Sequence, residues 1–79
     1  MKTMTISKKR ITFVNRLINA MYYSNNRNAS YYMTALAHDA LAGTEAAKLV
    51  AITDQLREIS VSHEWIANMA REILAEESE

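Results

Sequence analysis

The sequence predicts an all-α protein, a compact bundle of about four short helices arranged as two helical hairpins. Apolar residues recur at intervals of three and four positions through most of the 79-residue chain, which is the spacing of one buried face on a helix. The chain has no proline and a single glycine, so few positions oppose helix formation. No change in composition marks a domain boundary, and we therefore expect residues 1–79 to form a single helical domain.

The first helix is expected over roughly residues 8–24, because an apolar stripe with helical spacing runs through this range. Its members are Ile11, Val14, Leu17, Ile18 and Met21, with Phe13 at the edge. The second helix is expected over roughly 29–42, with Asn28 or Ser30 as candidate N-caps and Gly43 as the terminating residue. Its buried side would consist of Met33, Leu36, Ala37, Ala40 and Leu41.

The third helix is expected over roughly 45–59, with Thr44 as its cap and Glu45 near the positive end of the helix dipole. Its seam would be Leu49, Ile52, Leu56 and Ile59. The fourth helix is expected over roughly 63–76, with Ser62 as its cap. Its buried side would be Trp65, Ile66, Met69, Ala70, Ile73 and Leu74. The sequence ends in AEESE, and carboxylates are unfavourable at a helix C-terminus, so we expect this end to fray.

A second fold remains open for the first half of the chain. Polar Thr3, Thr5 and Ser7 alternate with apolar Met4 and Ile6, and such alternation is typical of a half-buried strand. This short strand, the helix after it and the segment NRNASYYMTALAHDAL resemble the ribbon-helix-helix DNA-binding family over residues 2–42. The resemblance implies a dimer whose two strands enter the major groove with Thr3, Thr5 and Ser7 facing the bases. Two extra C-terminal helices would follow that unit in this chain.

Charge is distributed unevenly along the sequence. Residues 1–38 contain six lysine and arginine residues and no carboxylate, whereas residues 39–79 contain nine carboxylates and three basic residues. The halves therefore carry +6 and −6, which indicates an anionic partner, head-to-tail self-association, or attraction between the halves within one fold. Residues 52–71 also allow a helix-turn-helix, but Glu64 and Glu72 on its second helix would repel phosphates.

Patterns for catalysis and metal binding are missing from the sequence. There is no cysteine, and His63-Glu64 begins an H-E-x-x-H pattern in which position 67 is alanine instead of the second histidine. His38 and Asp39 are neighbours on a predicted helix and would point about 100° apart. Neither a nucleophile elbow nor a glycine-rich phosphate loop is present. We therefore expect a protein that is not an enzyme and that requires no cofactor and no metal.

The stretch AMYYSNNRNASYYM, residues 20–33, predicts a partner-binding surface. A helical hairpin would bring Tyr22-Tyr23 and Tyr31-Tyr32 together around a polar loop, with one tyrosine of each pair covering the core and the other facing water. Tyrosine and arginine are enriched at interface hot spots. The predicted partner-binding residues are Tyr22, Tyr23, Asn26, Arg27, Tyr31 and Tyr32. The predicted electrostatic steering residues are Lys8, Lys9, Arg10 and Arg16.

The leading functional hypothesis is a small non-enzymatic helical binding protein, encoded by a phage or mobile element. It would dock on a larger protein or nucleoprotein complex and inhibit or adapt it, as an inhibitor of host defence does. The alternative is a dimeric DNA-binding transcriptional regulator that uses the basic N-terminal half, and a homodimer is possible in either case. No segment approaches the ~20 apolar residues of a membrane-spanning helix, so we expect no membrane partner and a cytoplasmic location in a bacterium or infected host cell.

Overall fold

The computed structural model of the chain describes residues 6–59 and 64–78, which form four helices and no strand. The helices are α1 (Lys8–Tyr22), α2 (Arg27–Ala42), α3 (Ala46–Ile59) and α4 (Glu64–Glu77). The predicted all-α bundle is confirmed, and each helix limit lies within two residues of its predicted position. Most of the strand proposed for the ribbon-helix-helix alternative lies outside the described residues. At its described end, Ser7 is not a strand residue but the N-cap of α1.

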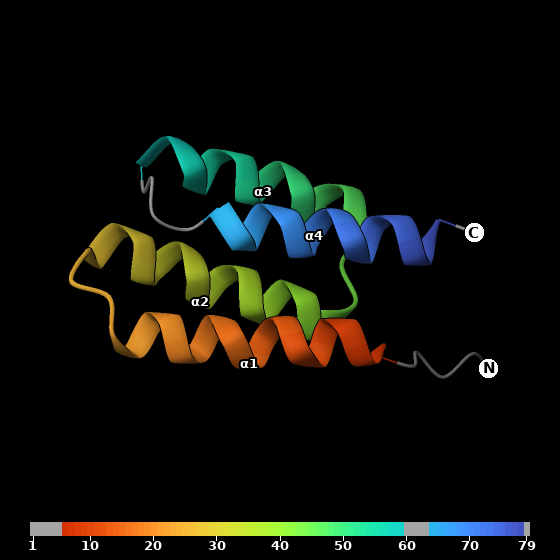
Figure 1. Cartoon of the computed structure of the whole chain (residues 1–79), viewed down its shortest axis with the longest axis horizontal. Helices are drawn as coiled ribbons and strands as arrows, with labels where there is room; N and C mark the ends of the chain where they lie inside the picture. The colour runs from red at the N-terminus through yellow and green to blue at the C-terminus, as the bar shows by residue number, and fades with distance from the viewer. Residues whose placement is uncertain (1–5, 60–63, 79) are drawn as a thin grey trace.

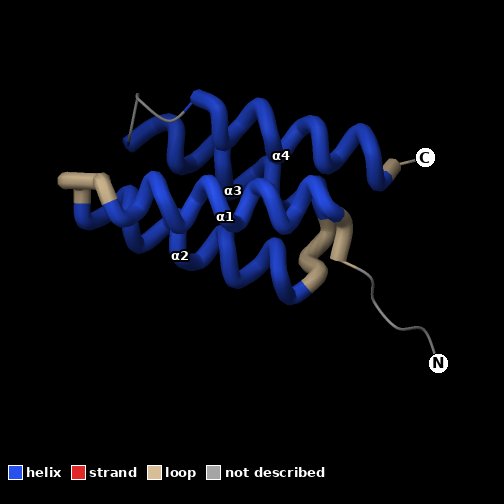
Figure 2. The backbone as a smooth tube through the Cα atoms, turned by 60° about the horizontal axis from the view of Figure 1, so that its bottom comes forward, coloured by secondary structure: helices blue, strands red, loops and turns tan. Residues whose placement is uncertain are grey.

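The four helices form two antiparallel hairpins that pack against each other (Figures 1 and 2). Helices α1 and α2 make the first hairpin and α3 and α4 the second, while α2 also contacts α3 and α1 contacts α4. Figure 1 shows α3 and α4 running antiparallel along their length, which differs from the steep crossing of a helix-turn-helix unit. The start of α1 and the end of α4 lie at the same end of the bundle (Figure 1).

The core lies between the hairpins and receives side chains from all four helices. The largest fully buried side chains are Phe13, Leu17, Met33, Leu36, Leu49, Thr53, Leu56, Ile66 and Ile73. The predicted face of α1 was wrong in part, because Phe13 is completely buried while Ile11 and Ile18 are 47% and 48% exposed. Leu41 of α2 is also 48% exposed. The buried arc of α1 is rotated toward Phe13 because α1 must contact α4 as well as α2.

Short polar contacts determine where the first two helices begin. The Ser7 hydroxyl accepts a hydrogen bond from the Arg10 amide at 3.2 Å, and the Asn26 side-chain oxygen accepts one from the Ala29 amide at 3.1 Å. Asn26 is therefore the N-cap of α2, and the predicted caps Asn28 and Ser30 were wrong, since both lie inside the first turn.

The turn between α2 and α3 depends on the single glycine of the chain. Gly43 ends α2 with a φ of 82°, a left-handed conformation that glycine adopts without a steric penalty. The Thr44 amide then donates to the Asp39 carbonyl at 3.1 Å, as in a Schellman motif. The Glu45 carbonyl accepts hydrogen bonds from the amides of the third and fourth residues of α3, so Glu45 takes the capping position predicted for Thr44. The predicted cap of α4, Ser62, lies outside the described residues.

Candidate partner-binding surface

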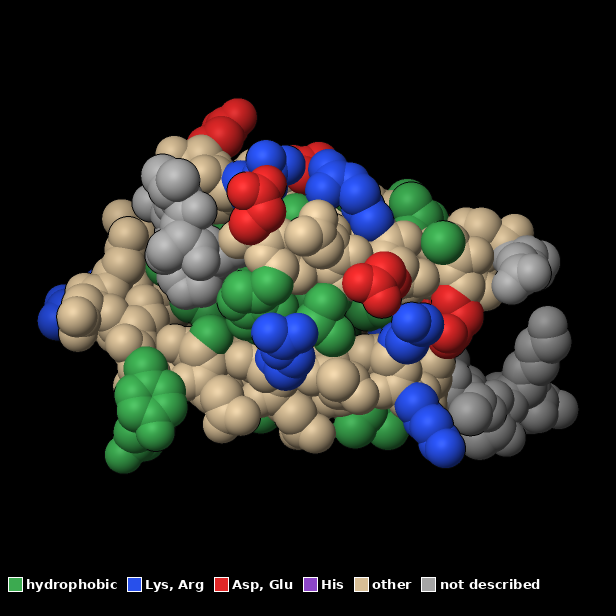
Figure 3. Space-filling view, in the orientation of Figure 1, with side chains coloured by type: hydrophobic (Ala, Val, Ile, Leu, Met, Phe, Trp, Pro, Cys, Tyr) green, Lys and Arg blue, Asp and Glu red, His purple; other side chains and the backbone are tan. Residues whose placement is uncertain are grey.

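Three tyrosines project into solvent where α1 is followed by α2. Tyr22, Tyr23 and Tyr31 are 81%, 79% and 72% exposed, and hydrophobic side chains, green in Figure 3, project from this end of the molecule. Tyr32 is partly buried against the core. The second pair thus divides between core and solvent as predicted. For the first pair that prediction was wrong, because both tyrosines face solvent.

The tyrosine rings contact their sequence neighbours. The Tyr22 and Tyr23 rings meet edge to face with centroids 5.2 Å apart and planes at 74°, and the Tyr31 and Tyr32 rings do so at 5.9 Å and 80°. Edge-to-face contacts of this kind are attractive. A tyrosine side chain has only two rotatable torsions. A rigid aromatic group loses little conformational entropy when it binds.

The loop and the first turn of α2 contribute polar groups to the same surface. Asn26 was predicted to contact a partner, but its side-chain oxygen is engaged in capping α2. Asn25, Arg27 and Asn28 are exposed. Arg27 is the first residue of α2, where a positive charge opposes the helix dipole and weakens the helix. We call Tyr22, Tyr23, Asn25, Arg27 and Tyr31 the tyrosine surface.

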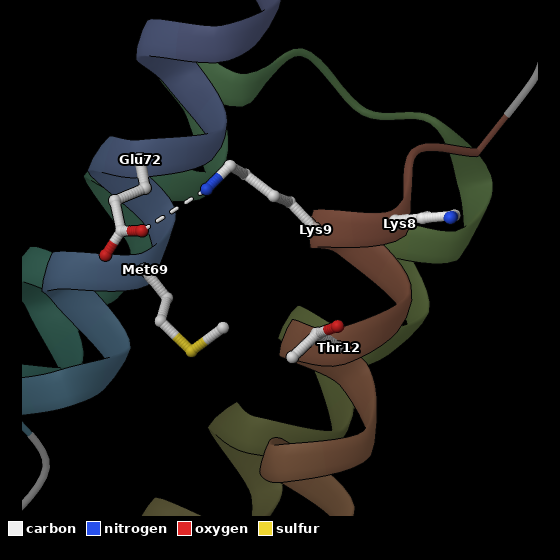
Figure 4. A pocket seen from close by; sticks show the side chains of 5 residues that line it. All are labelled: Lys8, Lys9, Thr12, Met69 and Glu72. Carbon is white, nitrogen blue, oxygen red and sulfur yellow. Dashed lines mark hydrogen bonds and ion pairs between the residues drawn. The ribbon is translucent and has the colours of Figure 1, made fainter.

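Three of the four predicted steering residues are engaged within the fold. The Lys9 ammonium lies 3.4 Å from a Glu72 carboxylate oxygen (Figure 4). The Arg16 guanidinium carbon stands 4.5 Å from the centroid of the Trp65 ring, a cation–π contact between α1 and α4. Lys8 is exposed and points away from the Lys9 ion pair (Figure 4). It lies at the opposite end of α1 from the tyrosines.

Arg10, the fourth predicted steering residue, is buried and joins three segments of the chain. Its Nε and Nη2 atoms contact the two carboxylate oxygens of Glu77 at 2.6 and 2.7 Å. Nη1 donates to the Ala40 carbonyl at 3.0 Å and Nη2 to the Thr44 carbonyl at 2.7 Å. Hydrogen bonding to Glu77 raises the pKa of Arg10, and the same contact lowers the pKa of the Glu77 carboxyl. The steering role proposed for Arg10 is therefore wrong.

The same contact involves the acidic end of α4, where fraying was expected. The helix continues to Glu77, whose carboxylate is held by Arg10, and the Ser78 amide still donates to the Leu74 carbonyl at 3.0 Å. The unfavourable position of a carboxylate at a helix C-terminus is thus compensated by a paired cation from α1.

Opposite charges of the two halves meet inside this fold. Both ion pairs between α1 and α4 join a basic residue of the first half to a glutamate of the second. On the second hairpin, Asp54 lies 2.9 Å from Arg71, and Arg57 lies 2.8 Å from Glu64. Blue and red side chains accordingly alternate along the upper edge of Figure 3. Attraction between the halves is therefore part of what holds the bundle together.

Small surface depressions accompany these elements. One adjoins the tyrosine surface, has a volume of about 290 Å³, and is lined along α2 by Tyr31, Thr34, Ala35, His38 and Asp39. Another, between α1 and α4, has a volume of about 270 Å³ and is bridged by the Lys9–Glu72 contact (Figure 4). The first offers an apolar recess beside an exposed aromatic ring, an arrangement suited to receiving a partner side chain.

Residues 6–59 and 64–78 contain no group of three or more histidine, aspartate or glutamate side chains placed to hold a metal ion. Within the same ranges, no helix combines the length and apolar character needed to cross a membrane. Comparison of the chain with protein-family models, with curated proteins and with solved structures finds no match.

Proposed function

We propose that this chain is a small non-enzymatic binding protein that docks through the tyrosine surface onto a larger protein or nucleoprotein complex and inhibits or adapts it. A phage or mobile element would encode it, with the machinery of host defence as a representative target. The observation that carries the proposal is the exposure of Tyr22, Tyr23 and Tyr31 at one end of the bundle. Their rings contribute little to the core, whereas burial against a partner would remove a large apolar area from water.

Arg27 supports the same conclusion because its charge destabilises the start of α2. A cation in the first turn of a helix is unfavourable by about 0.3–1 kcal/mol, and no acidic residue lies in that turn to offset it. Beside three exposed aromatic rings, an arginine can form hydrogen bonds and stack on a partner, and tyrosine and arginine dominate interface hot spots. The partner we propose therefore presents apolar recesses together with hydrogen-bond acceptors.

A protein surface fits this site better than nucleic acid. Tight binding to phosphates requires several basic side chains, each neutralising one phosphate. Arg27 is the basic member of the tyrosine surface, and Lys8 lies at the far end of α1, about 20 Å away at the rise of an α-helix. The observation that favours the DNA-binding alternative is that α1 contains no acidic residue. Its cations Lys9 and Arg10, however, are paired with carboxylates of α4.

The proposal is tested by capturing partners with matched bait proteins. We would compare the wild-type chain with a Tyr23→Ala/Tyr31→Ala variant and with a Gln55→Ala/Glu58→Ala control, which alters two exposed residues of α3. We expect one complex to be retained from a bacterial lysate by wild type and control and lost with the tyrosine variant. Loss of two hot-spot tyrosines corresponds to about 100-fold weaker binding or more. Equal retention by all three baits would contradict the proposal.

Nucleic-acid binding is measured in parallel. Fluorescence anisotropy of labelled duplex DNA and single-stranded RNA is followed at several salt concentrations. We expect no binding that survives physiological salt. An affinity that falls steeply as salt rises would instead show that several basic residues contact phosphates. That result would replace the docking proposal with the DNA-binding alternative.

A further inference from the structure

The outer face of α1 carries a second stripe that the core does not use. All of its members are exposed, and successive members are separated alternately by three and four residues: Lys8, Ile11, Asn15, Ile18 and Tyr22. This alternation places them on one face of the helix and is the spacing of a coiled-coil seam. We call this set the outer seam. It contains Ile11 and Ile18, the two aliphatic residues of α1 that the fold leaves about half exposed.

Leu41 of α2 extends the apolar surface beside the outer seam. The Thr34 hydroxyl lies 2.7 Å from the Met21 sulfur, which places Thr34 on the side of α2 that faces α1. Leu41 follows Thr34 by seven residues, or two turns, and so lies on the same side. Ile18 precedes Met21 by three residues and is on the matching side of α1. The exposed aliphatic side chains therefore gather along the junction of α1 and α2, away from the second hairpin.

The outer seam is complementary to itself when reversed. Lys8 lies seven residues before Asn15, and Tyr22 lies seven residues after it. Ile11 lies four residues before Asn15, and Ile18 lies three residues after it. A two-fold axis through Asn15 would therefore place Lys8 against Tyr22 of a second copy and bring Ile11 to within one residue, about 1.5 Å along the helix, of its Ile18. A two-fold contact requires one surface to match itself in this way. We propose that the chain forms an antiparallel homodimer through the outer seam.

The charges on α1 select the antiparallel arrangement. Helix α1 has no acidic residue, so a parallel pair would bring two Lys8 side chains together without a compensating carboxylate. The antiparallel pair separates them by about 20 Å, beyond the ~8 Å screening length at physiological salt. It also places each ammonium over a tyrosine ring, where a cation is attracted by the aromatic face.

Asn15 at the centre of the outer seam adds specificity. A side-chain amide both donates and accepts, so two copies of Asn15 on the axis can bond to each other. A single asparagine in an otherwise apolar helix seam fixes register and orientation at some cost in stability. The seam covers only two heptads, and we therefore expect a small, reversible contact rather than an obligate dimer. Tyr22 belongs to both the outer seam and the tyrosine surface, whereas Tyr23 and Tyr31 stay outside the seam, so the Tyr23→Ala/Tyr31→Ala variant tests partner binding separately.

Single-cysteine variants test the arrangement directly, because the chain has no cysteine of its own. Under mild oxidation, Asn15→Cys lies on the axis and should form disulfide-linked dimers in several-fold greater yield than a Gln55→Cys control on α3. Ile11→Cys and Ile18→Cys should cross-link better when mixed than when either is oxidised alone. An Asn15→Cys yield no higher than the control would overturn the dimer. A yield for the mixture no higher than that of either protein oxidised alone would overturn its antiparallel orientation.

Sedimentation equilibrium supplies a second test with unmodified protein. The mean mass of wild type should rise toward twice the chain mass with concentration. Ile18→Glu should weaken association by about tenfold or more, because it places a charge in the apolar part of the seam. Gln55→Glu adds the same charge at an exposed position of α3, away from the seam, and should weaken association much less. A wild-type mass that stays monomeric at every concentration, or equal effects of the two substitutions, would refute the proposal.

Discussion

Replacing Arg10 with methionine should destabilise the bundle more than any substitution of an exposed charge. The Arg10 side chain is 6% exposed, and the Glu77 side chain bound to it is 30% exposed. Breaking a fully buried ion pair costs about 3–5 kcal/mol. Since water can reach Glu77 once Arg10 is removed, we expect a smaller loss, about 2–4 kcal/mol. Part of that loss comes from the Ala40 and Thr44 carbonyls, which lose the guanidinium as a hydrogen-bond donor.

That loss is large relative to the stability of a domain of this size. At 0.05–0.15 kcal/mol per residue, the 79-residue chain should have an unfolding free energy of about 4–12 kcal/mol. A loss of 2–4 kcal/mol would lower the melting temperature by roughly 10–30 °C. Glu77→Gln should also be costly, because it keeps the shape of the acceptor but leaves the buried guanidinium without its counter-charge.

The assay is urea unfolding followed by far-UV circular dichroism, with Lys9→Met as the matched control. Lys9 belongs to an exposed ion pair in which the side chains are 42% and 61% exposed, and such pairs contribute at most about 1 kcal/mol. A double-mutant cycle of Arg10→Met and Glu77→Gln isolates the energy of the pair itself. If Arg10→Met costs no more than Lys9→Met, the buried contact does not hold the helix ends together as we infer.

Three further predictions concern single residues. The pKa of Glu77 is lowered, so its stabilising contribution is fully present above the ordinary carboxyl pKa of 4.5 and is lost as the pH falls through the folded-state value. The difference in unfolding free energy between wild type and a Glu77→Gln variant should therefore shrink as the pH falls below 4.5. A difference that stays constant with pH would contradict this. Asn26→Ala should cost about 1 kcal/mol in urea unfolding because it removes the cap of α2, whereas Asn28→Ala should be nearly neutral, and the reverse order would refute the cap assignment. Gly43→Ala should cost about 1–2 kcal/mol because its φ of 82° is unfavourable for a residue with a Cβ, and an unchanged melting temperature would contradict that reason.

The number and approximate limits of the helices could be predicted because they depend on local spacing. The buried face of α1 could not, since the segment 10–21 allows two overlapping stripes with helical spacing. One includes Ile11 and Ile18, and the other includes Phe13, which the structure buries. Contact with both α2 and α4 decides between them, and that information is not local. The cap of α2 was ambiguous for a related reason, because several polar residues in a short loop can each cap a helix.

The tyrosine surface was predictable in outline because four tyrosines flank a polar loop. The exposure of both members of the first pair was not, since it depends on Tyr32 and Met21 already covering this part of the core. Arg10 was misassigned because its partners lie 30 to 67 residues away in the chain. One local signal existed: Arg10 precedes Phe13 and Leu17 by three and seven residues, the spacing of the buried face.

The contact between Arg10 and Glu77 also determines the order in which the chain can fold. It spans 67 residues, whereas each hairpin forms from neighbouring helices joined by a short loop. Closing so long a segment loses more chain entropy than closing a hairpin, and the contact requires both hairpins to be docked. We therefore expect it to form after the rate-limiting step, so that losing it accelerates unfolding and leaves the folding rate almost unchanged. The lifetime of the folded protein would then depend on a contact between the two ends of its chain.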